Sequence, residues 1–214
     1  MKKQKKDKTV IFSILGIIAI VIFIAFIDKV IPSPVIDESK IKRNLESAPN
    51  YHEVYPNATG NVTVLEFSDF QCPFCKQSYP IIEKLRQRYG DEIMIKYKHF
   101  PLPMHEYAMD SAIASECARL QGKFWEYHNV LFENQNSLST ASLKKYAQKL
   151  NLDTEKFDSC LDNKETIAKV QKDFNEGNKL GVSGTPTFFI NDKKIEGGMP
   201  YDQFVIAIDG VLGR

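Results

Sequence analysis

The chain has 214 residues, of which 43% are hydrophobic, so it can bury the core of a domain of ordinary size and still carry appendages. Its formal charge is +1, but five lysines and one aspartate in the first eight residues account for +4, so the remainder carries −3. This composition argues against a disordered chain and against a nucleic-acid-binding surface.

The amino terminus combines a basic segment, residues 1–9, with an uncharged apolar segment, residues 10–27. As a helix rising about 1.5 Å per residue, the apolar segment would reach roughly 27 Å, close to the ~30 Å hydrocarbon core of a bilayer. We therefore predict a cytoplasmic tail at 1–9 and a single-pass membrane anchor at 10–27, with the positive-inside rule placing the rest outside the cytoplasm. A cleaved signal peptide is the alternative, although its apolar stretch is usually about 7 to 15 residues long.

Residues 28–60 contain several prolines and charged side chains, and we predict a linker there. The first part of a folded domain follows at residues 61–103. Its pattern predicts a strand at 62–69, a helix through 75–89 and a second strand at 92–98.

Cys72 and Cys75 form a C-x-x-C pair at the start of the expected helix. Unpaired N–H groups and the positive end of the helix dipole stabilise a thiolate there, so Cys72 is the predicted attacking or attacked sulfur and Cys75 the resolving thiol. A structural disulfide or half of a zinc site are the alternatives. Zinc would need a second closely spaced pair, which the other two cysteines do not form, so we expect neither a metal nor a cofactor.

Glu66 and Lys96 are charged residues within the two expected strands. A buried charge needs a partner or a shifted pKa, whereas a charge at a solvated strand end needs neither. The residue pattern alone leaves both interpretations open.

Residues 104–180 are rich in helix-forming residues, and we predict an all-helical insertion there. Cys117 and Cys160 lie in two of the expected helices. Outside the cytoplasm we favour a disulfide between them, which would stabilise the domain by roughly 4 kcal/mol in the chain-entropy model. Two buried free thiols are the alternative.

Residues 181–214 return to strand composition and end in a helical pattern, so the insertion interrupts a small mixed α/β sheet. Pro186 stands at the mouth of the returning strand, where it cannot pair in a sheet ladder. A cis Thr185–Pro186 bond would present the Thr185 backbone to an extended peptide beside the dithiol, although proline is more often trans.

Three stretches together resemble the DsbA-like thiol-disulfide oxidoreductases. They are residues 65–75 (LEFSDFQCPFC), 121–128 (QGKFWEYH) and 184–190 (GTPTFFI), and the likeness extends over about residues 49–212. The resemblance implies a thioredoxin-like fold with an all-helical insertion, here preceded by the single N-terminal transmembrane helix.

The resemblance also implies roles for individual residues. Cys72 would be the exposed nucleophile and Cys75 the resolving cysteine. Glu66 and Lys96 would form a buried acid–base pair that moves protons to and from the dithiol.

The substrate contacts that the resemblance implies are Pro73, Phe74, Thr185 and Pro186, with Pro186 in the cis form. Phe74 departs from the strongly oxidising members, which carry histidine at this position. Phenylalanine can neither donate a hydrogen bond nor supply a charge to the Cys72 thiolate, so we expect a less stabilised reduced form and a weaker oxidant.

The expected function is that of a monomeric, membrane-tethered oxidase that introduces disulfides into exported proteins. The family likeness implies reoxidation by a quinone-reducing membrane partner, either DsbB-like or VKOR-like. A reductase or isomerase uses the same chemistry in another direction, and no dimerisation segment of the isomerase kind is evident. A redox-inert peptide-binding module is the alternative from another class, and the presence of both cysteines speaks against it.

Overall fold

The computed structural model describes residue 60 and residues 62–214. The predicted cytoplasmic tail, the predicted anchor at 10–27 and nearly all of the predicted linker lie outside these residues. Within residue 60 and residues 62–214, no helix combines the length and the apolar character needed to cross a membrane.

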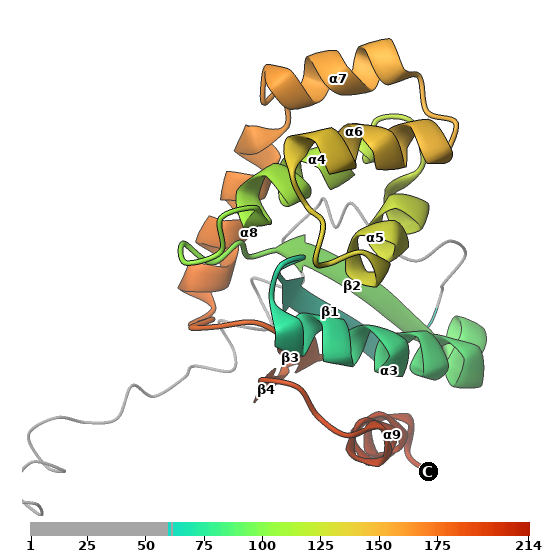
Figure 1. Ribbon diagram of the computed structural model, residues 1–214. Coiled ribbons are helices and arrows are strands. Elements are labelled where there is room, and N and C mark those ends of the chain that lie inside the picture. Colours follow the sequence, from blue (N-terminus) through green and yellow to red (C-terminus); the bar gives the residue numbers. More distant parts are fainter. Residues whose placement is uncertain (1–59, 61) are drawn as a thin grey trace, which may run out of the picture. The chain divides into compact units, whose positions relative to one another are not determined.

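A mixed four-stranded sheet forms the centre of the domain (Figure 1). The strands are β1 (Val62–Ser68), β2 (Ile93–His99), β3 (Thr187–Ile190) and β4 (Lys193–Glu196), in the spatial order β2-β1-β3-β4. Strand β1 pairs in parallel with β2, whereas β3 is antiparallel to both β1 and β4. A parallel pair needs a crossover connection, and helix α3 (Pro73–Tyr89) with the short turn Gly90–Glu92 supplies it.

Helices cover both faces of the sheet. Helix α3 and the C-terminal helix α9 (Tyr201–Leu212) pack on one face, against side chains that include Val64, Ile95 and Phe188. On the other face Leu65 and Phe67 of β1 and Phe189 of β3 form a second buried cluster. Phe174 of α8 (Ile167–Lys179) packs against that cluster, so β1 is buried on both sides.

In the sequence, the whole helical insertion comes between β2 and β3, as the colours of Figure 1 show. Its helices are α4 (Ala108–Arg119), α5 (Phe124–Glu133), α6 (Thr140–Lys149), α7 (Thr154–Asp162) and α8. No strand interrupts them, as the composition of residues 104–180 predicts.

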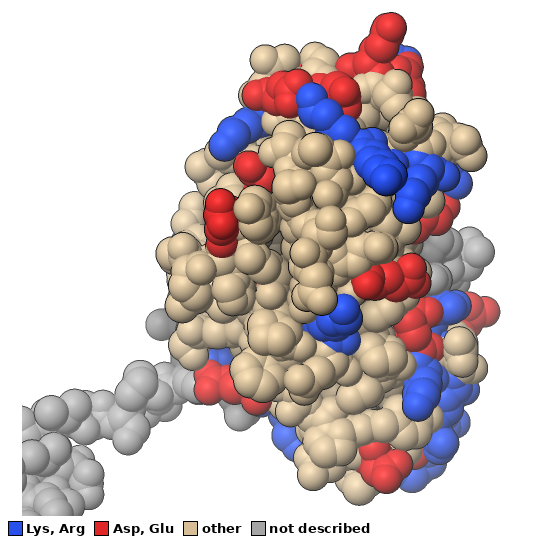
Figure 2. All heavy atoms as spheres, viewed as in Figure 1, with Lys and Arg blue, Asp and Glu red and all other residues tan. Residues whose placement is uncertain are grey.

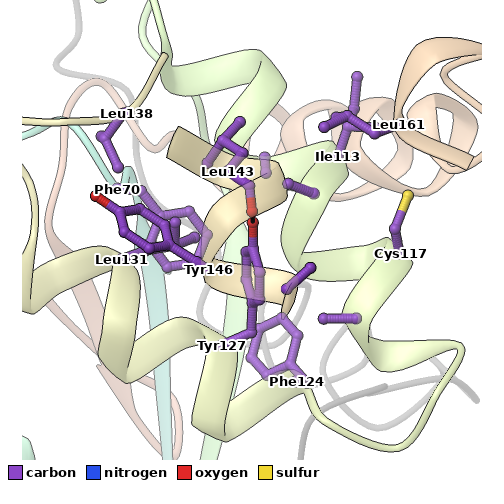
Figure 3. Close-up of a cluster of buried hydrophobic side chains, with 14 of the residues drawn as sticks. Phe70, Ile113, Cys117, Phe124, Tyr127, Leu131, Leu138, Leu143, Tyr146 and Leu161 are labelled. Atoms are coloured by element: carbon purple, nitrogen blue, oxygen red, sulfur yellow. Dashed lines mark hydrogen bonds between the residues drawn. The ribbon is translucent and has the colours of Figure 1, made fainter. Parts of the chain in front are cut away.

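The core of the insertion reaches the dithiol. Figure 3 shows Tyr127 pointing toward α6, where its hydroxyl donates to the Leu143 carbonyl oxygen at 2.9 Å. Phe70, from the loop before Cys72, packs in the same buried cluster. The core that supports α5 and α6 therefore also supports the loop that carries the nucleophile.

A disulfide joins Cys117 of α4 to Cys160 of α7, with an S–S distance of 2.05 Å. The pairing favoured from the sequence is present, and these two cysteines are not free thiols. The bond crosslinks two helices of the insertion across 43 positions of sequence.

Candidate active site

Cys72 stands at the N-cap of α3, and Pro73 takes the first helical position, where the missing N–H would have no partner inside the helix. A turn brings the Cys72 N–H to the Asp69 carbonyl oxygen at 3.0 Å. Cys72 exposes only 3% of its surface, whereas Phe74 exposes 59%. The expectation of an exposed nucleophile is therefore wrong for this reduced form, because the sulfur is turned inward against a neighbouring loop.

That loop precedes β3 and contains a cis peptide bond between Thr185 and Pro186. When protonated, the Cys72 thiol donates to the Thr185 carbonyl oxygen, with a sulfur–oxygen distance of 3.3 Å. The antiparallel pairing of β1 with β3 brings these two residues together although 113 positions separate them in the sequence.

The pKa of Cys72 is lowered to about 5. The largest cause is the hydrogen bond from the Cys75 thiol, which outweighs the opposing effect of burial on this pKa. The Thr185 side chain and the backbone N–H groups of Cys75 and Phe74 lower the pKa of Cys72 further. Residue 74 thus supports the thiolate through its backbone, so the support does not require a polar side chain there.

Cys75 has the opposite character. It is fully buried, and burial is the main reason that its pKa lies well above the ordinary value for a thiol. Its hydrogen bond to Cys72 and the negative charge of Glu66 raise the pKa of Cys75 as well. Near neutral pH the pair therefore consists of a thiolate at Cys72 and a protonated thiol at Cys75, as attack and resolution require.

Glu66 is buried in β1, on the face of the sheet that α3 covers. Burial is the main cause that raises the pKa of Glu66 to about 7, the charge of Cys72 raises it as well, and the Ser68 hydroxyl works in the opposite direction. A carboxyl group with this pKa can both accept and donate a proton at neutral pH.

The structure does not bring Lys96 to Glu66, so the expected buried acid–base pair is absent. Lys96 is the register partner of Leu65 in β1, whereas Glu66 is paired with Tyr97. Because side chains alternate between the faces of a sheet, Lys96 lies on the face opposite Glu66 and Cys75. Its pKa is lowered by burial and by the charge of Lys98, its neighbour on that face.

Tyr97, which the sequence did not single out, takes the position beside Glu66. It exposes 4% of its surface and belongs to the same buried cluster as Cys72 and Cys75. The sequence could have pointed to Tyr97 because it directly follows Lys96, and neighbouring residues of a strand lie on opposite faces of the sheet. A pairing shifted by one residue therefore places Tyr97, not Lys96, beside Glu66.

Two further residues that the sequence did not single out hold the loop before α3. The carboxylate of Asp69 accepts hydrogen bonds from the Leu102 N–H at 2.9 Å and pairs with Nδ1 of His105 at 2.7 Å. The side-chain amide of Gln135 donates to the Cys72 carbonyl oxygen at 2.8 Å. These hydrogen bonds connect the loop that carries Cys72 to the loop after β2 and to the helical insertion.

A groove of about 530 Å³ opens beside the dithiol. Of the expected substrate contacts, Phe74 and Thr185 line it, and Pro73 and Pro186 are not among its lining residues. The remaining lining comes from α3 and from the segment between β4 and α9: Gln77, Ser78, Ile81, Gly197, Gly198, Met199 and Pro200. The groove reaches the dithiol through Thr185, whose carbonyl oxygen lies 3.3 Å from the Cys72 sulfur.

Within residue 60 and residues 62–214, no group of three or more histidine, cysteine, aspartate or glutamate side chains is arranged to hold a metal ion. The chemistry that these residues themselves offer is the transfer of two electrons between a thiolate–thiol pair and a disulfide, with a buried carboxyl group nearby.

Residues 51–210 match the sequence model of a family described as thioredoxin. Among curated proteins, Na(+)/H(+) antiporter NhaA 3 of Salinispora tropica is 38% identical over 142 residues, which cover 66% of this chain and 21% of the antiporter. The chain thus spans less than a third of the length of the curated relatives it matches.

Solved structures show the same architecture. A thioredoxin-like oxidoreductase from Silicibacter pomeroyi superposes with a TM-score of 0.70 at 27% identity, covering 77% of this chain and 94% of that one. The thiol-disulfide exchange protein alpha-DsbA2 from Wolbachia pipientis superposes with a TM-score of 0.68 and covers 84% of this chain and all of that one. At 17% identity, the second likeness shows the fold alone.

Proposed function

Because this chain belongs to the thioredoxin family and is a thiol-disulfide oxidoreductase of the DsbA-like kind, we propose that it introduces disulfides into exported proteins, as a monomer tethered to the membrane outside the cytoplasm. The observation that carries the proposed direction is the lowered pKa of Cys72, about 5. A stabilised thiolate stabilises the reduced form, and a pair with a stabilised reduced form is an oxidant.

The proposed reaction begins when a substrate thiolate attacks the Cys72 sulfur of the Cys72–Cys75 disulfide. The bond between the two cysteines breaks, its electron pair stays on the Cys75 sulfur, and the substrate is held in a mixed disulfide with Cys72. A second substrate thiolate then attacks the substrate sulfur, and Cys72 leaves as a thiolate. A leaving thiol of low pKa departs faster, so the properties of Cys72 favour release of the oxidised substrate.

The groove beside the dithiol fits an unfolded substrate segment. Its apolar lining includes Phe74, Ile81 and Met199, and it lies alongside α3. Figure 2 shows charged side chains over α6 and α7 and also around the C-terminal half of α3, a helix that carries Lys76, Glu83, Lys84, Arg86 and Arg88. The apolar part of the groove lining suits apolar segments of many sequences, which a general oxidase must accept.

Two further parts of the proposal concern the location and the electron acceptor. The uncharged segment at residues 10–27 supports a membrane anchor, and the matching domain also occurs in relatives named Na(+)/H(+) antiporters. A membrane-bound domain is well placed to be reoxidised by a quinone-reducing membrane protein, DsbB-like or VKOR-like.

The equilibrium of the Cys72–Cys75 pair with glutathione tests the proposed direction. We expect a reduction potential of about −120 to −180 mV, in the range of oxidising members and isomerases, measured by alkylation of the thiols and mass spectrometry. A value near the thioredoxin value of about −270 mV would contradict the oxidase and favour the alternative of a reductase.

Replacing Cys72 tests the alternative of a redox-inert binding module. In Cys72→Ala the groove remains, so a binding module would retain peptide affinity and biological activity. We expect the variant to lose all oxidase activity toward a reduced, unfolded protein with two cysteines, because no mixed disulfide can form.

A further inference from the structure

A group of buried oxygen atoms lies behind Cys75, on the face of the sheet that α3 covers. Glu66, Ser68 and Tyr97 expose 5%, 1% and 4% of their surfaces. Glu66 and Tyr97 are register partners on parallel neighbouring strands, so their side chains project from the same face. Ser68, two residues after Glu66 in β1, projects from that face as well.

Two of these oxygen atoms, Ser68 Oγ and Tyr97 Oη, are buried and make no hydrogen bond of ordinary distance and angle within the described part of the chain. The Ser68 hydroxyl nevertheless lies close enough to Glu66, Cys75 and Tyr97 to lower the pKa of each. A buried hydroxyl without a well-formed hydrogen bond destabilises a fold, so its presence needs an explanation other than packing.

The ring of Tyr97 is firmly held although its hydroxyl is not. It stacks on Phe70 with a centroid distance of 5.4 Å and an interplanar angle of 21°. The ring of His128 lies nearly perpendicular to it, with a centroid distance of 5.0 Å and an interplanar angle of 88°. The hydroxyl is thus kept in the cluster that contains both cysteines, near the Ser68 hydroxyl but without a hydrogen bond of ordinary geometry to hold it.

We propose that the Tyr97 hydroxyl passes a proton between the Glu66 carboxyl group and the Cys75 sulfur in each exchange, an inference that rests on the proposed function. When a substrate thiolate breaks the Cys72–Cys75 bond, Cys75 receives the electron pair as a thiolate. Tyr97 gives its proton to that sulfur and takes one from Glu66, which becomes a carboxylate. When Cys75 later attacks a mixed disulfide, its proton returns to Glu66 by the same route.

The protonation states of the three groups suit this transfer. Glu66, with a pKa of about 7, changes state near neutral pH. Burial and the charges of Glu66 and Cys75 hold the pKa of Tyr97 well above its ordinary value, so the phenol stays neutral and acts by giving one proton while accepting another.

Other titratable groups face this cluster from each element packed on it. They are Cys72 and Cys75 at the start of α3, Asp69 in the loop after β1, His99 on β2 and His128 on α5. Burial lowers the pKa of His128 to about 4, so it is neutral at physiological pH. The Nε2 atom of His99 is held by Glu116 at 3.0 Å and is turned to that partner.

The test follows the lifetime of the mixed disulfide between Cys72 and glutathione. Reduced full-length protein is mixed with oxidised glutathione, quenched with acid at intervals and examined by mass spectrometry. In the wild type, we expect the rate at which Cys75 resolves the mixed disulfide to rise with pH and to level off above about pH 7, as Glu66 becomes the carboxylate that accepts the proton. In Tyr97→Phe, we expect the mixed disulfide to persist about tenfold longer or more between pH 6 and 8, and the rate to keep rising above pH 8, where hydroxide must take the proton.

Tyr127→Phe is the matched control, since it also removes one buried tyrosine hydroxyl but acts within the insertion, where that hydroxyl bonds to Leu143. It should lose stability and keep the wild-type lifetime, whereas Tyr97→Phe should keep its stability. A wild-type lifetime and pH profile in Tyr97→Phe, or an equal delay in Tyr127→Phe, would overturn the role of Tyr97 while leaving the proposed function intact. Wild-type thiols that stay unreacted in excess oxidised glutathione would overturn both.

Discussion

The side-chain amide of Gln135 donates to the carbonyl oxygen of Cys72 at 2.8 Å, so the helical insertion contacts the backbone of the nucleophile itself. The same nitrogen donates to the Phe70 carbonyl oxygen at 2.9 Å. Gln135 lies between α5 and α6. The insertion therefore does more than cover the sheet, because it fixes the position at which α3 begins.

Replacing Gln135 should loosen this position. In Gln135→Leu the carbonyl groups of Phe70 and Cys72 lose a shared donor, and we expect the free energy of unfolding to fall by about 1–3 kcal/mol, measured by urea denaturation. Asn134→Ala is the neighbouring control, because it removes only a solvent-exposed hydrogen bond to Val130. Equal stability of the two variants would contradict the role given to Gln135.

The ionisation of Cys72 should appear in both reactivity and stability. Because the folded chain lowers the pKa of this thiol from 9.0 to about 5, the rate of alkylation by iodoacetamide should be half-maximal near pH 5. The folded, reduced protein binds fewer protons at Cys72 than the unfolded chain between these two values. Its stability relative to Cys72→Ser should therefore rise from pH 5 to pH 9 and be lost as the pH falls through 5. A constant difference over this range would contradict the lowered pKa.

Because Glu66 of β1 and Lys96 of β2 lie on opposite faces of the sheet, replacing one or the other should affect the dithiol differently. Glu66→Gln should slow resolution of the mixed disulfide at neutral pH by about tenfold or more, because no carboxylate is left to accept the Cys75 proton. Lys96→Met should leave the pH dependence of that step unchanged, since Lys96 lies on the opposite face. The same acid-quench experiment measures the rate in both variants. Equal slowing in the two would support the Glu66–Lys96 acid–base pair expected from the sequence.

Much of the fold and of the candidate site was predictable from the sequence. The order of strands and helices was predictable, because β-branched residues, helix formers and turn residues separate cleanly along the chain. The dithiol at a helix start and the proline before β3 were predictable as well, since each has a chemical requirement that few positions meet. Pairing between Cys117 and Cys160 followed from the inferred compartment rather than from spacing.

The partner of Glu66 was not predictable, for a physical reason. Strand β2 alternates between Ile95 and Tyr97 on one face and the lysines Lys96 and Lys98 on the other. Strand β1 is buried on both faces, so the pattern does not show which set of β2 side chains shares the face of Glu66. A shift of one residue exchanges Lys96 and Tyr97 between the faces. The role of Gln135 was not predictable either, because its hydrogen bond to Cys72 depends on how the helical insertion packs against the sheet.

Removing the disulfide of the insertion should affect stability and leave the dithiol unchanged. The double variant Cys117→Ala and Cys160→Ala opens a loop with a sequence separation of 43. We expect its free energy of unfolding to fall by roughly 4 kcal/mol in the chain-entropy model, measured by urea denaturation under non-reducing conditions. The alkylation profile of Cys72 serves as the internal control, and a profile shifted in pH would mean that the insertion also controls the thiolate.

Phe74 offers the sharpest test of how the reduced form is stabilised. Its side chain is 59% exposed and contributes to the Cys72 thiolate only through the backbone N–H, so this position can accept a polar ring without repacking the core. In Phe74→His the imidazole adds a hydrogen-bond donor and, when protonated, a positive charge beside the thiolate. We expect the pKa of Cys72 to fall below its present value of about 5 and the reduction potential to become more oxidising, toward the DsbA value of about −120 mV.

Phe74→Leu is the matched control for that change, because it keeps an apolar side chain in the groove and the same backbone donor. It should leave both the pKa of Cys72 and the potential unchanged. Alkylation measures the pKa, and equilibration with glutathione measures the potential. If Phe74→His changed neither quantity, the backbone N–H groups and the Cys75 thiol would already stabilise the thiolate fully, and the residue at position 74 would act on substrate binding alone.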